Sequence, residues 1–437
     1  MEKKCLSQAT QRMVGIFLTM VFMLFFFYRP GLADSLDDLK RQIDALQHQV
    51  QEIEKKQAAD TGKTDVPSKG NGKGSFRLPG LNTELTIGGY VKLDVVHSDA
   101  SAGVDSDSDR YFYPPAIPLD SDPTTSKTVL TAKQSRLFVK SHTPTPLGDL
   151  KVYLEGDFYG QGGNQKVSNS STWRLRQAYG ELGNLLAGQT WSTFMNPAAL
   201  PETIDFGGPA AEIFVRQAQI RWTQPFQWGS VQVAAENPET WFISNDTDVI
   251  QAADDDRIPD IVARLNLNTG VGNFSIAGLG REYRVDSAGV DASTYAGAVS
   301  LAGIIPIFGK DDLRFTVSYG NGLGRYMYTN FEGAELDVND NNLEAVDQWG
   351  GFLAYRHFWT DSLRSTLSYS YGEADNDVDI VGTGVNKKYQ SFHGNLIWSP
   401  IPAANFGIEY IWGYRELENG QNGDLNRIQF AVQYKFF

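Results

Sequence analysis

Between Thr83 and Phe437 the sequence alternates apolar and polar residues and shows no helical periodicity of any length. The segment that begins at Leu85 places apolar residues on one face and polar residues, such as Tyr90 and Lys92, on the other. Successive side chains of a strand point to opposite faces. A strand of about 9–11 residues with this pattern is the unit of a transmembrane β-barrel. The same pattern recurs in Leu150–Phe158, Leu313–Tyr319, Leu363–Tyr371 and Phe406–Arg415.

Connections of two lengths alternate along this part of the chain. Seven short connections, such as Gly183-Asn184, alternate with eight long ones, and the long one after the fifth strand is Met195–Ile213. Fifteen connections join sixteen strands. Short turns on one rim and long loops on the other are typical of outer-membrane barrels. We therefore expect a 16-stranded antiparallel transmembrane β-barrel over residues 83–437, wide enough for an aqueous channel.

A soluble β-sandwich is the alternative, because it also has one apolar face per strand. It does not account for the aromatic residues near strand ends, such as Trp222 and Trp398, which suit the interfaces of a membrane. Nor does it account for the terminal strand IQFAVQYKFF, which resembles the sorting signal of outer-membrane proteins. In the usual form of that signal the terminal Phe lies on the same face as the preceding aromatic residues. Here one extra residue, Phe437, shifts the last position to the other face.

Residues 1–33 have the features of a secretory signal. Lys3, Lys4 and Arg12 precede an apolar stretch over Met13–Tyr28, and a Gly-Leu-Ala site precedes Asp34. An uncleaved anchor is the alternative, but the stretch is shorter than the roughly 20 residues that a spanning helix needs. The only cysteine, Cys5, lies in the signal, so a cysteine nucleophile, a disulfide framework or a zinc knuckle is not expected.

Residues 34–57 carry a heptad seam that predicts a short periplasmic coiled coil. It has fewer than three heptads, so it is not expected to be stable alone. A single amphipathic helix packed on the domain is the alternative. Residues 58–82 have the composition of a flexible linker. The seam residues are Leu36, Leu39, Ile43, Leu46, Val50 and Ile53.

Charge is distributed unevenly. The chain has 38 basic and 52 acidic residues, and the predicted signal holds four of the former and one of the latter, which leaves a mature net charge of −17. Such a charge argues against a nucleic-acid partner. Segments 98–125, 237–257, 321–347 and 372–386 contain 22 acids and three bases. We expect them to be solvated outer loops that contact divalent cations and lipopolysaccharide. A calcium site at Asp105, Asp107 and Asp109 is a weaker alternative, since the EF-hand pattern fails there.

Arginines of the predicted strands stand opposite apolar neighbours. An arginine on the lipid face near the midplane costs about 2–4 kcal/mol. Several such residues would exceed the net stability of a fold, so we expect them to line the lumen and to select anions. The alternative is ion pairing within the wall, with Asp157, Glu155, Glu236 or Glu409. These arginines are Arg136, Arg174, Arg176, Arg221, Arg264, Arg314, Arg356 and Arg364.

The long connection Met195–Ile213 contains three prolines and Gly207-Gly208, so it is expected to be shaped rather than flexible. We expect it to fold into the barrel and narrow the pore. Its carboxylates Glu202, Asp205 and Glu212 would then face the wall arginines and set up a transverse field.

The stretch RLRQAYGELGNLLAGQTWSTFMNPAALPETIDFGGP, together with the N-terminal heptads, resembles the DcaP-like family of trimeric outer-membrane porins. The resemblance implies a homotrimer with periplasmic coiled coils and uptake of small anions, dicarboxylates among them. It implies neither a cofactor nor a metal.

The expected function is therefore passive diffusion of small hydrophilic solutes across the outer membrane. One alternative is a solute-specific channel for phosphate or another oxyanion, and another is a tether to the cell wall through the N-terminal helix. An enzyme is not expected, because none of the five histidines lies in a distinctive arrangement with a nucleophile.

Overall fold

The computed structural model describes residues 44–46, 48, 51–52, 68–70, 74–101, 106–253, 255–287, 289–328 and 331–436. The predicted signal lies outside this part of the chain. So do the seam residues Leu36, Leu39, Ile43, Val50 and Ile53. The described residues of the 34–57 segment, Leu46 among them, are helical and exposed. Within the described ranges, no helix is long and apolar enough to cross a membrane.

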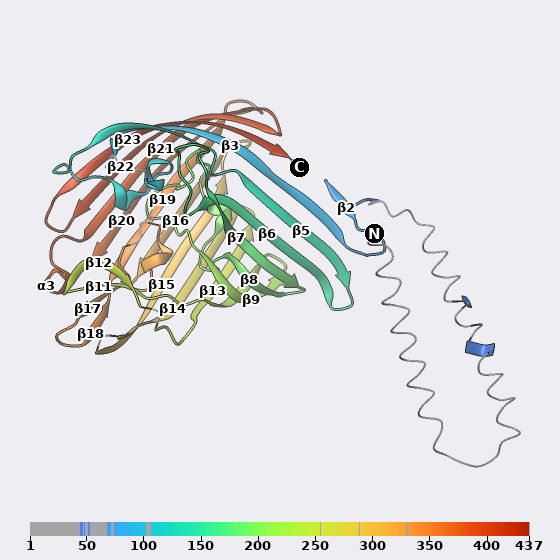
Figure 1. Cartoon of the computed structure of the whole chain (residues 1–437), viewed down its shortest axis with the longest axis horizontal. Helices are drawn as coiled ribbons and strands as arrows, with labels where there is room; N and C mark the ends of the chain where they lie inside the picture. The colour runs from blue at the N-terminus through green and yellow to red at the C-terminus, as the bar shows by residue number, and fades with distance from the viewer. Residues whose placement is uncertain are drawn as a thin grey trace, which may run out of the picture. The chain divides into compact units, whose positions relative to one another are not determined.

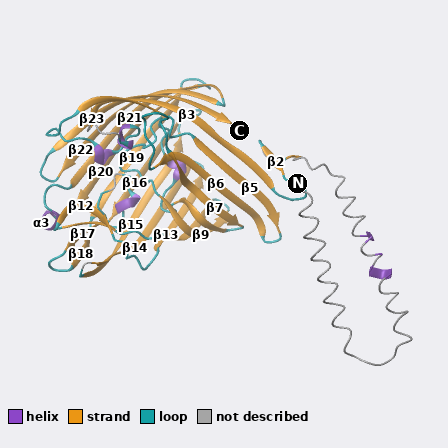
Figure 2. Ribbon diagram, in the orientation of Figure 1, coloured by secondary structure: helices purple, strands orange, loops and turns teal. Residues whose placement is uncertain are grey.

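The main unit, Ser68–Phe437, is a closed 16-stranded antiparallel barrel, which confirms the expected fold (Figures 1 and 2). The last strand closes it by pairing with the first, with Phe430 opposite Val95. Two elements, β4 (Thr125–Thr131) and β5 (Arg136–Thr145), together occupy one barrel position, because they pair with successive halves of β3 (Glu84–Ser101).

The barrel strands are β3 (Glu84–Ser101), β4 (Thr125–Thr131), β5 (Arg136–Thr145), β6 (Gly148–Gly160), β7 (Thr172–Leu182), β8 (Leu185–Trp191), β9 (Arg216–Phe226), β10 (Gly229–Glu236), β13 (Asp260–Thr269), β14 (Gly272–Ser287), β15 (Val290–Pro306), β16 (Asp312–Gly320), β19 (Asp347–Phe358), β20 (Leu363–Asp375), β21 (Asn386–Ile401), β22 (Ala404–Leu417) and β23 (Asn422–Phe436).

Elements outside the barrel wall belong mostly to the long loops. A separate four-stranded sheet joins two of these loops, 237–259 and 321–346. Its strands are β11 (Trp241–Ser244), β12 (Thr247–Ala252), β17 (Ala334–Asp337) and β18 (Asn342–Ala345). The short helices are η1 (Asp107–Asp109), η2 (Pro114–Ala116), η3 (Pro197–Ala199), η4 (Gly324–Tyr326) and α3 (Val378–Val381).

The end of the predicted linker differs from expectation. Two short strands, β1 (Ser68–Lys69) and β2 (Ser75–Arg77), lie within residues 58–82, and β2 pairs with the start of β3. Arg77 Nη2 also lies 3.0 Å from Glu84 Oε1. Alternation on a stretch of three residues is too short to be recognised in the sequence.

Apolar side chains cover the outside of the wall, as the alternation predicts. On β3, for example, Val91 and Leu93 are exposed, whereas Lys92 and Asp94 between them are buried. The apolar core of the protein lies instead inside the barrel, among three long loops. These are the first loop (106–124), the inward loop (192–215) and the sixth loop (321–346).

Hydrogen bonds join these three loops to one another. The inward and sixth loops form an antiparallel bridge at Ile213 and Met327. Tyr328 of the sixth loop donates its hydroxyl to the Phe112 carbonyl of the first loop at 2.6 Å. Only one of the three, the inward loop, was expected inside the barrel.

Glycines on the inner wall make room for the loops. Gly350 and Gly372 face each other on β19 and β20, and a Cβ on either would lie 2.8 or 2.7 Å from the Cβ of Ala211 in the inward loop. A Cβ on Gly413 would lie 2.5 Å from the Phe112 ring of the first loop. A glycine inside a strand often marks such a close approach.

Gly372→Ala should displace the inward loop, because the new methyl group overlaps Ala211. Overpacking of this kind costs about 1–3 kcal/mol. We expect an altered single-channel conductance in a planar bilayer and a lower unfolding temperature. Gly280→Ala on β14 is the matched control, since no atom lies within 4 Å of its added Cβ. Equal conductance of the two variants would show that Ala211 does not fix the loop.

Candidate pore constriction

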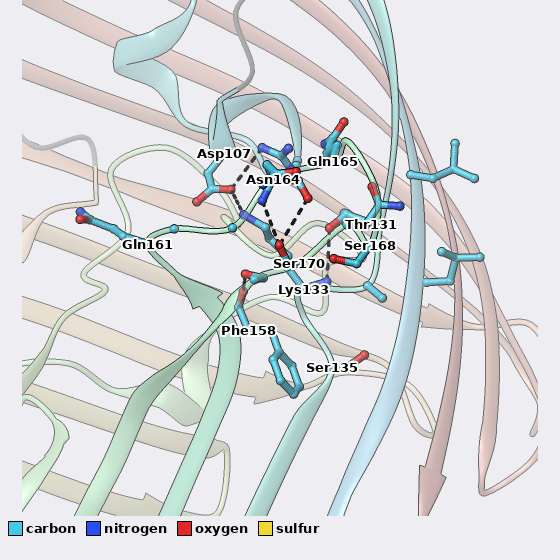
Figure 3. Close-up of a pocket in the computed structure, with 18 residues that line it drawn as sticks. Asp107, Thr131, Lys133, Ser135, Phe158, Gln161, Asn164, Gln165, Ser168 and Ser170 are labelled. Carbon is cyan, nitrogen blue, oxygen red and sulfur yellow. Dashed lines mark hydrogen bonds and ion pairs between the residues drawn. The ribbon is translucent and has the colours of Figure 1, made fainter.

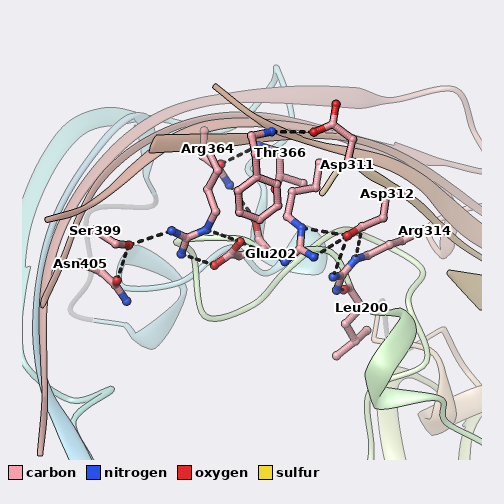
Figure 4. A network of polar contacts seen from close by, with 12 residues as sticks. Leu200, Glu202, Asp311, Asp312, Arg314, Arg364, Thr366, Ser399 and Asn405 are labelled. Atoms are coloured by element: carbon pink, nitrogen blue, oxygen red, sulfur yellow. Dashed lines mark hydrogen bonds and ion pairs between the residues drawn. The ribbon is translucent and has the colours of Figure 1, made fainter. Parts of the chain in front are cut away.

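The inward loop is fastened to the far wall by ion pairs with β19 and β20 and by a hydrogen bond from β16 (Figure 4). Arg364 binds the carboxylate of Glu202 with two hydrogen bonds, Nε to Oε2 at 2.7 Å and Nη2 to Oε1 at 2.5 Å. Arg356 Nη1 lies 3.5 Å from the same carboxylate. Burial alone would raise the pKa of Glu202, but its hydrogen bond to Arg364 and the nearby arginines lower it below its ordinary value.

Carbonyl groups of the inward loop accept hydrogen bonds from three other wall side chains. Arg314, whose Nε lies 2.7 Å from Asp312 Oδ1, donates Nη1 to the Leu200 carbonyl at 2.6 Å. Arg264 donates to the Met195 carbonyl, and Asn395 donates to the Glu202 carbonyl at 2.8 Å. The loop backbone is therefore held at several points along its length.

The tip of the inward loop is clamped at Ile204. Lys92 of β3 donates Nζ to the Ile204 carbonyl at 2.6 Å, and the Ile204 amide donates to the carboxylate of Glu409 on β22. The Ile204 side chain packs against Gly407, where a Cβ would lie 2.4 Å from its Cδ1. A cavity of about 100 Å³ lies beside this clamp, lined by Lys92 and Arg364 among others.

Asp205 and Glu212 form no salt bridge with the wall arginines expected to face them, although Arg427 of β23 lies near enough to Asp205 to interact with it. Both are buried, with exposed fractions of 3% and 2%. Asp205 accepts the amides of Phe112 and Gly207 at 3.0 and 2.7 Å, so it holds the first loop against the inward loop. Burial raises the pKa of both carboxyl groups. Alternation could not predict this, because a loop has no fixed inner face.

On the near wall, Arg174 and Arg176 of β7 point into the barrel, as the alternation predicts, but they are paired. Arg174 Nη2 and Arg176 Nη1 lie 2.8 and 3.0 Å from Asp157 Oδ2. Arg176 Nε lies 2.9 Å from Glu155 Oε1. Arg136 on β5 reaches Glu155 at 3.8 Å. Three arginines thus share two carboxylates.

Aromatic rings cover this arginine cluster. Both Arg174 and Arg176 place their guanidinium carbons 5.5 Å from the ring centroid of Phe206 in the inward loop. Phe206 stacks on Tyr159 of β6, with ring centroids 4.7 Å apart. Cation–π contacts of this kind are worth about 0.5–2 kcal/mol each. On the near wall (β5 to β7), arginines and Tyr159 therefore contact the Phe206 ring of the inward loop. On the far wall (β16, β19 and β20), arginines bind the Glu202 carboxylate and a carbonyl group of the loop.

Three inner-wall arginines, Arg216, Arg221 and Arg264, form no salt bridge within the described part of the chain, although Glu236 lies near enough to Arg221 and Arg264 to interact with both. No side-chain hydrogen bond is formed by Arg216 or Arg221, and Arg264 contacts only the Met195 carbonyl. Arg216 lies over the ring of Trp191 at 4.8 Å. Each of the three has a buried guanidinium nitrogen without an acceptor.

Sequence reasoning missed Arg216 and Lys92 as parts of the site, whereas it named Glu409 only as a possible ion-pair partner within the wall. Arg216 and Arg221 are five residues apart, so simple alternation assigns them to opposite faces. Arg216 lies at the first residue of β9, where the chain leaves the inward loop. The strand glycines Gly350, Gly372, Gly407 and Gly413 were the available signal for where loops rest on the wall.

Two buried carboxyl groups lie in the sixth loop, outside the barrel wall. Glu332 and Glu335 each have one carboxylate oxygen without a partner among the described residues, and Glu335 accepts the amide of Asp377 at 2.9 Å. Burial raises the pKa of each to about 7. Nearby acids, including Asp377, contribute to the shift of Glu335.

Acidic residues of the first loop form ion pairs with lysines and are not grouped as the ligands of a metal site. Lys133 lies 2.8 Å from Asp107, and Lys127 lies 2.6 Å from Asp109. Over the described ranges, no three His, Cys, Asp or Glu side chains are placed to hold a metal ion.

A model of the DcaP outer membrane protein family matches residues 40–436. The chain is similar to the outer membrane channel DcaP of Acinetobacter baumannii, at 23% identity and a TM-score of 0.69, covering 81% of this chain and 98% of that one. It also resembles an anion-selective porin from Comamonas acidovorans, with 13% identity, 81% and 100% coverage and a TM-score of 0.51.

A third similar structure is OmpT of Vibrio cholerae in its trimer form, with 10% identity, 80% and 99% coverage and a TM-score of 0.50. At these identities the structures show the fold alone. No curated protein sequence matches the chain.

Arg364→Met should loosen the attachment of the inward loop to the far wall. It removes the bidentate partner of Glu202, and the loss of a hydrogen bond to a charged group costs about 1.5–3 kcal/mol. We expect a changed conductance and faster proteolysis within residues 192–215. The double variant Arg364→Met, Glu202→Leu should recover part of the loss, because no carboxylate is then left unpaired. A single variant that behaves like the parent would contradict the anchoring role.

Stability of the sixth loop should fall as pH rises through about 7. The folded-state pKa values of Glu332 and Glu335 lie above the ordinary 4.5, so their contribution is complete below about 4.5 and is lost through about 7. Hydrogen exchange in residues 331–346, corrected for intrinsic rates, should be faster at pH 8.5 than at pH 5.5. Replacing both acids by Gln should remove the difference, and a difference that persists would mean that other groups cause it.

Proposed function

The chain belongs to the DcaP outer membrane protein family, and from this premise we propose that it admits small hydrophilic solutes with a preference for small anions, dicarboxylates among them. The observation that carries the preference is the set of inner-wall arginines without carboxylate partners, Arg216, Arg221 and Arg264. A guanidinium presents its donors in a planar fork that matches a carboxylate. An anionic solute can therefore supply the partner that the protein leaves out.

The carboxylates of the inward loop itself do not cancel this charge. Glu202 is occupied by Arg364, and Asp205 accepts backbone amides. Burial raises the pKa of Asp205 and Glu212, which favours their neutral forms. On the near wall, three arginines share Glu155 and Asp157. The excess of positive charge at the constriction contrasts with the acidic outer loops and favours anions in the narrow region.

The proposed assembly is a homotrimer in the outer membrane of a Gram-negative bacterium. It is supported by the family match and by the trimer form of the similar Vibrio cholerae protein. We place the long loops outside, in contact with lipopolysaccharide, and residues 34–57 in the periplasm as a coiled coil, where they could also reach the cell wall. Diffusion down a gradient requires neither a catalytic group nor a cofactor.

The reversal potential in a planar bilayer under a KCl gradient tests the anion preference. We expect chloride to be preferred over potassium, and the triple variant Arg216→Gln, Arg221→Gln, Arg264→Gln to lose most of that preference. Arg257→Gln is the matched control, because Arg257 is an outer-loop residue paired with Glu282 at 2.8 Å.

Succinate should reduce the chloride current of the parent more than that of the triple variant. A cation preference of the parent would refute anion selectivity and leave the channel intact. Phosphate that blocks much more strongly than succinate would favour the oxyanion-specific alternative.

A further inference from the structure

Three aromatic side chains lie next to one another on the inner face of the near wall. Tyr153 on β6 stands between Val152 and Leu154, which are exposed on the outer face, so it points inward. Tyr179 on β7 is its direct partner across the strands, and Phe138 on β5 points inward by the same alternation. All three are partly exposed. We call Phe138, Tyr153 and Tyr179 the aromatic row.

The rings of the aromatic row lie along the wall. Phe138 and Tyr153 have ring centroids 5.6 Å apart and an angle of 28° between their planes, and for Tyr153 and Tyr179 the values are 5.7 Å and 38°. Phe138 lies against Gly88 of β3, where a Cβ would be 2.4 Å from its Cζ. Gly188 of β8 is the partner of Tyr179, so β8 places no side chain over that end. The row therefore presents ring faces to the lumen.

The aromatic row lies between the arginine cluster and the short turns at 146–147 and 183–184. On each of β5, β6 and β7 its member follows a member of the arginine cluster or its carboxylates by two or three positions toward the turn. These steps run from Arg136 to Phe138, from Glu155 to Tyr153 and from Arg176 to Tyr179. The inward loop contacts this wall at the arginine cluster, through Phe206. A solute that passes the inward loop from the long-loop side therefore meets the row next.

Basic side chains lie at both ends of the aromatic row. Lys140 on β5 is exposed and places Nζ 6.0 Å from the centroid of the Phe138 ring. At the other end, Tyr179 interacts with Arg221 of β9. Glu181 also interacts with Arg221, but the two form no salt bridge within the described residues. The row therefore places an apolar surface beside an arginine that has no salt-bridge partner.

The cavity beside β4 does not offer the same surface. It has a volume of about 700 Å³ (Figure 3). Phe158 alone is aromatic among the described residues that line it, and Leu93 and Leu130, which also line it, are exposed on the outer face of the wall. This cavity therefore opens on the outer face, whereas the aromatic row lies along the lumen.

We propose that the aromatic row and Arg221 form a subsite for solutes that carry a carboxylate on a flat aromatic ring. The subsite rests on the proposed anion preference and assigns it a class of solute. The ring stacks on Tyr179 and Tyr153, and the carboxylate accepts hydrogen bonds from the Arg221 guanidinium. Stacked aromatic pairs gain affinity beyond that of the buried area, and a guanidinium fork matches a carboxylate. A saturated, puckered ring of the same charge lacks the stacking part of this contact.

Single-channel currents in planar bilayers test the subsite with two probes of equal charge and similar size, benzoate and cyclohexanecarboxylate. The concentration of each probe that halves the chloride current is measured at pH 7, where both are ionised. For the parent, we expect benzoate to act at a concentration about three- to tenfold lower, as one stacking contact predicts. Tyr179→Leu should abolish this ratio, whereas Tyr179→Phe, which keeps the ring, should preserve it.

Two further variants separate the ring contact from the carboxylate contact. Arg221→Gln should weaken block by both probes and leave their ratio unchanged, because it removes the carboxylate contact alone. Tyr319→Leu is the matched control, since Tyr319 is 57% exposed on the outer face of β16, and it should change neither quantity. If Tyr179→Leu yields no conducting channels, Phe138→Leu at the other end of the row replaces it, with a smaller expected loss of the ratio.

Equal block of the parent by both probes would overturn the subsite, as would a ratio that survives Tyr179→Leu in channels of normal conductance. The reversal potential of the same channels reports the chloride preference separately. A parent that prefers chloride but does not distinguish the probes refutes the subsite and not the proposed function. A parent that prefers potassium and still distinguishes the probes refutes the anion preference and supports the aromatic contact.

Discussion

Backbone hydrogen bonding in a medium without water is the constraint on which this structure depends. Every N–H and C=O at membrane depth needs a partner within the protein, so the strands must close on themselves. Closure by β23 and β3 fixes the register of the wall, and the register fixes which side chains face inward. Polar residues then fill the lumen, and apolar residues cover the outside.

Inside the barrel a different problem arises, since three long loops bring their own backbone groups into a confined space. The wall satisfies those groups with long polar side chains. Arg314, Lys92 and Asn395 donate to loop carbonyls, while Glu409 accepts a loop amide. Strand glycines let the loops approach the wall closely enough for these contacts. Many inner-wall charges are therefore structural, and only those left over can act on a solute.

The sequence predicted the fold well, because alternation and loop length follow directly from strand geometry. It placed Arg174 and Arg364 inside, since the outer face forbids them, but it could not assign their partners. The pairing of Arg174 with Asp157 depends on the register between β6 and β7, which contains irregularities. Arg216 escaped notice because it begins a strand where the chain turns inward. Asp205 and Glu212 were misplaced because loops have no periodicity from which to infer a direction.

The misplaced acids change how selectivity must arise. A transverse field needs ionised carboxylates opposite the arginines, yet burial raises the pKa of Asp205 and Glu212, and Glu202 is neutralised by direct contact with Arg364. The constriction is therefore distinguished by arginines that outnumber the carboxylates paired with them, and not by arginines on one side facing ionised carboxylates on the other. An arginine such as Arg221, desolvated and without an acceptor, is an unfavourable state that a passing carboxylate relieves. Of the three, Arg221 and Arg264 interact with each other, so they are the pair that one solute with two carboxylates could contact together. This contact is the physical basis of the proposed preference for dicarboxylates over singly charged anions of similar size.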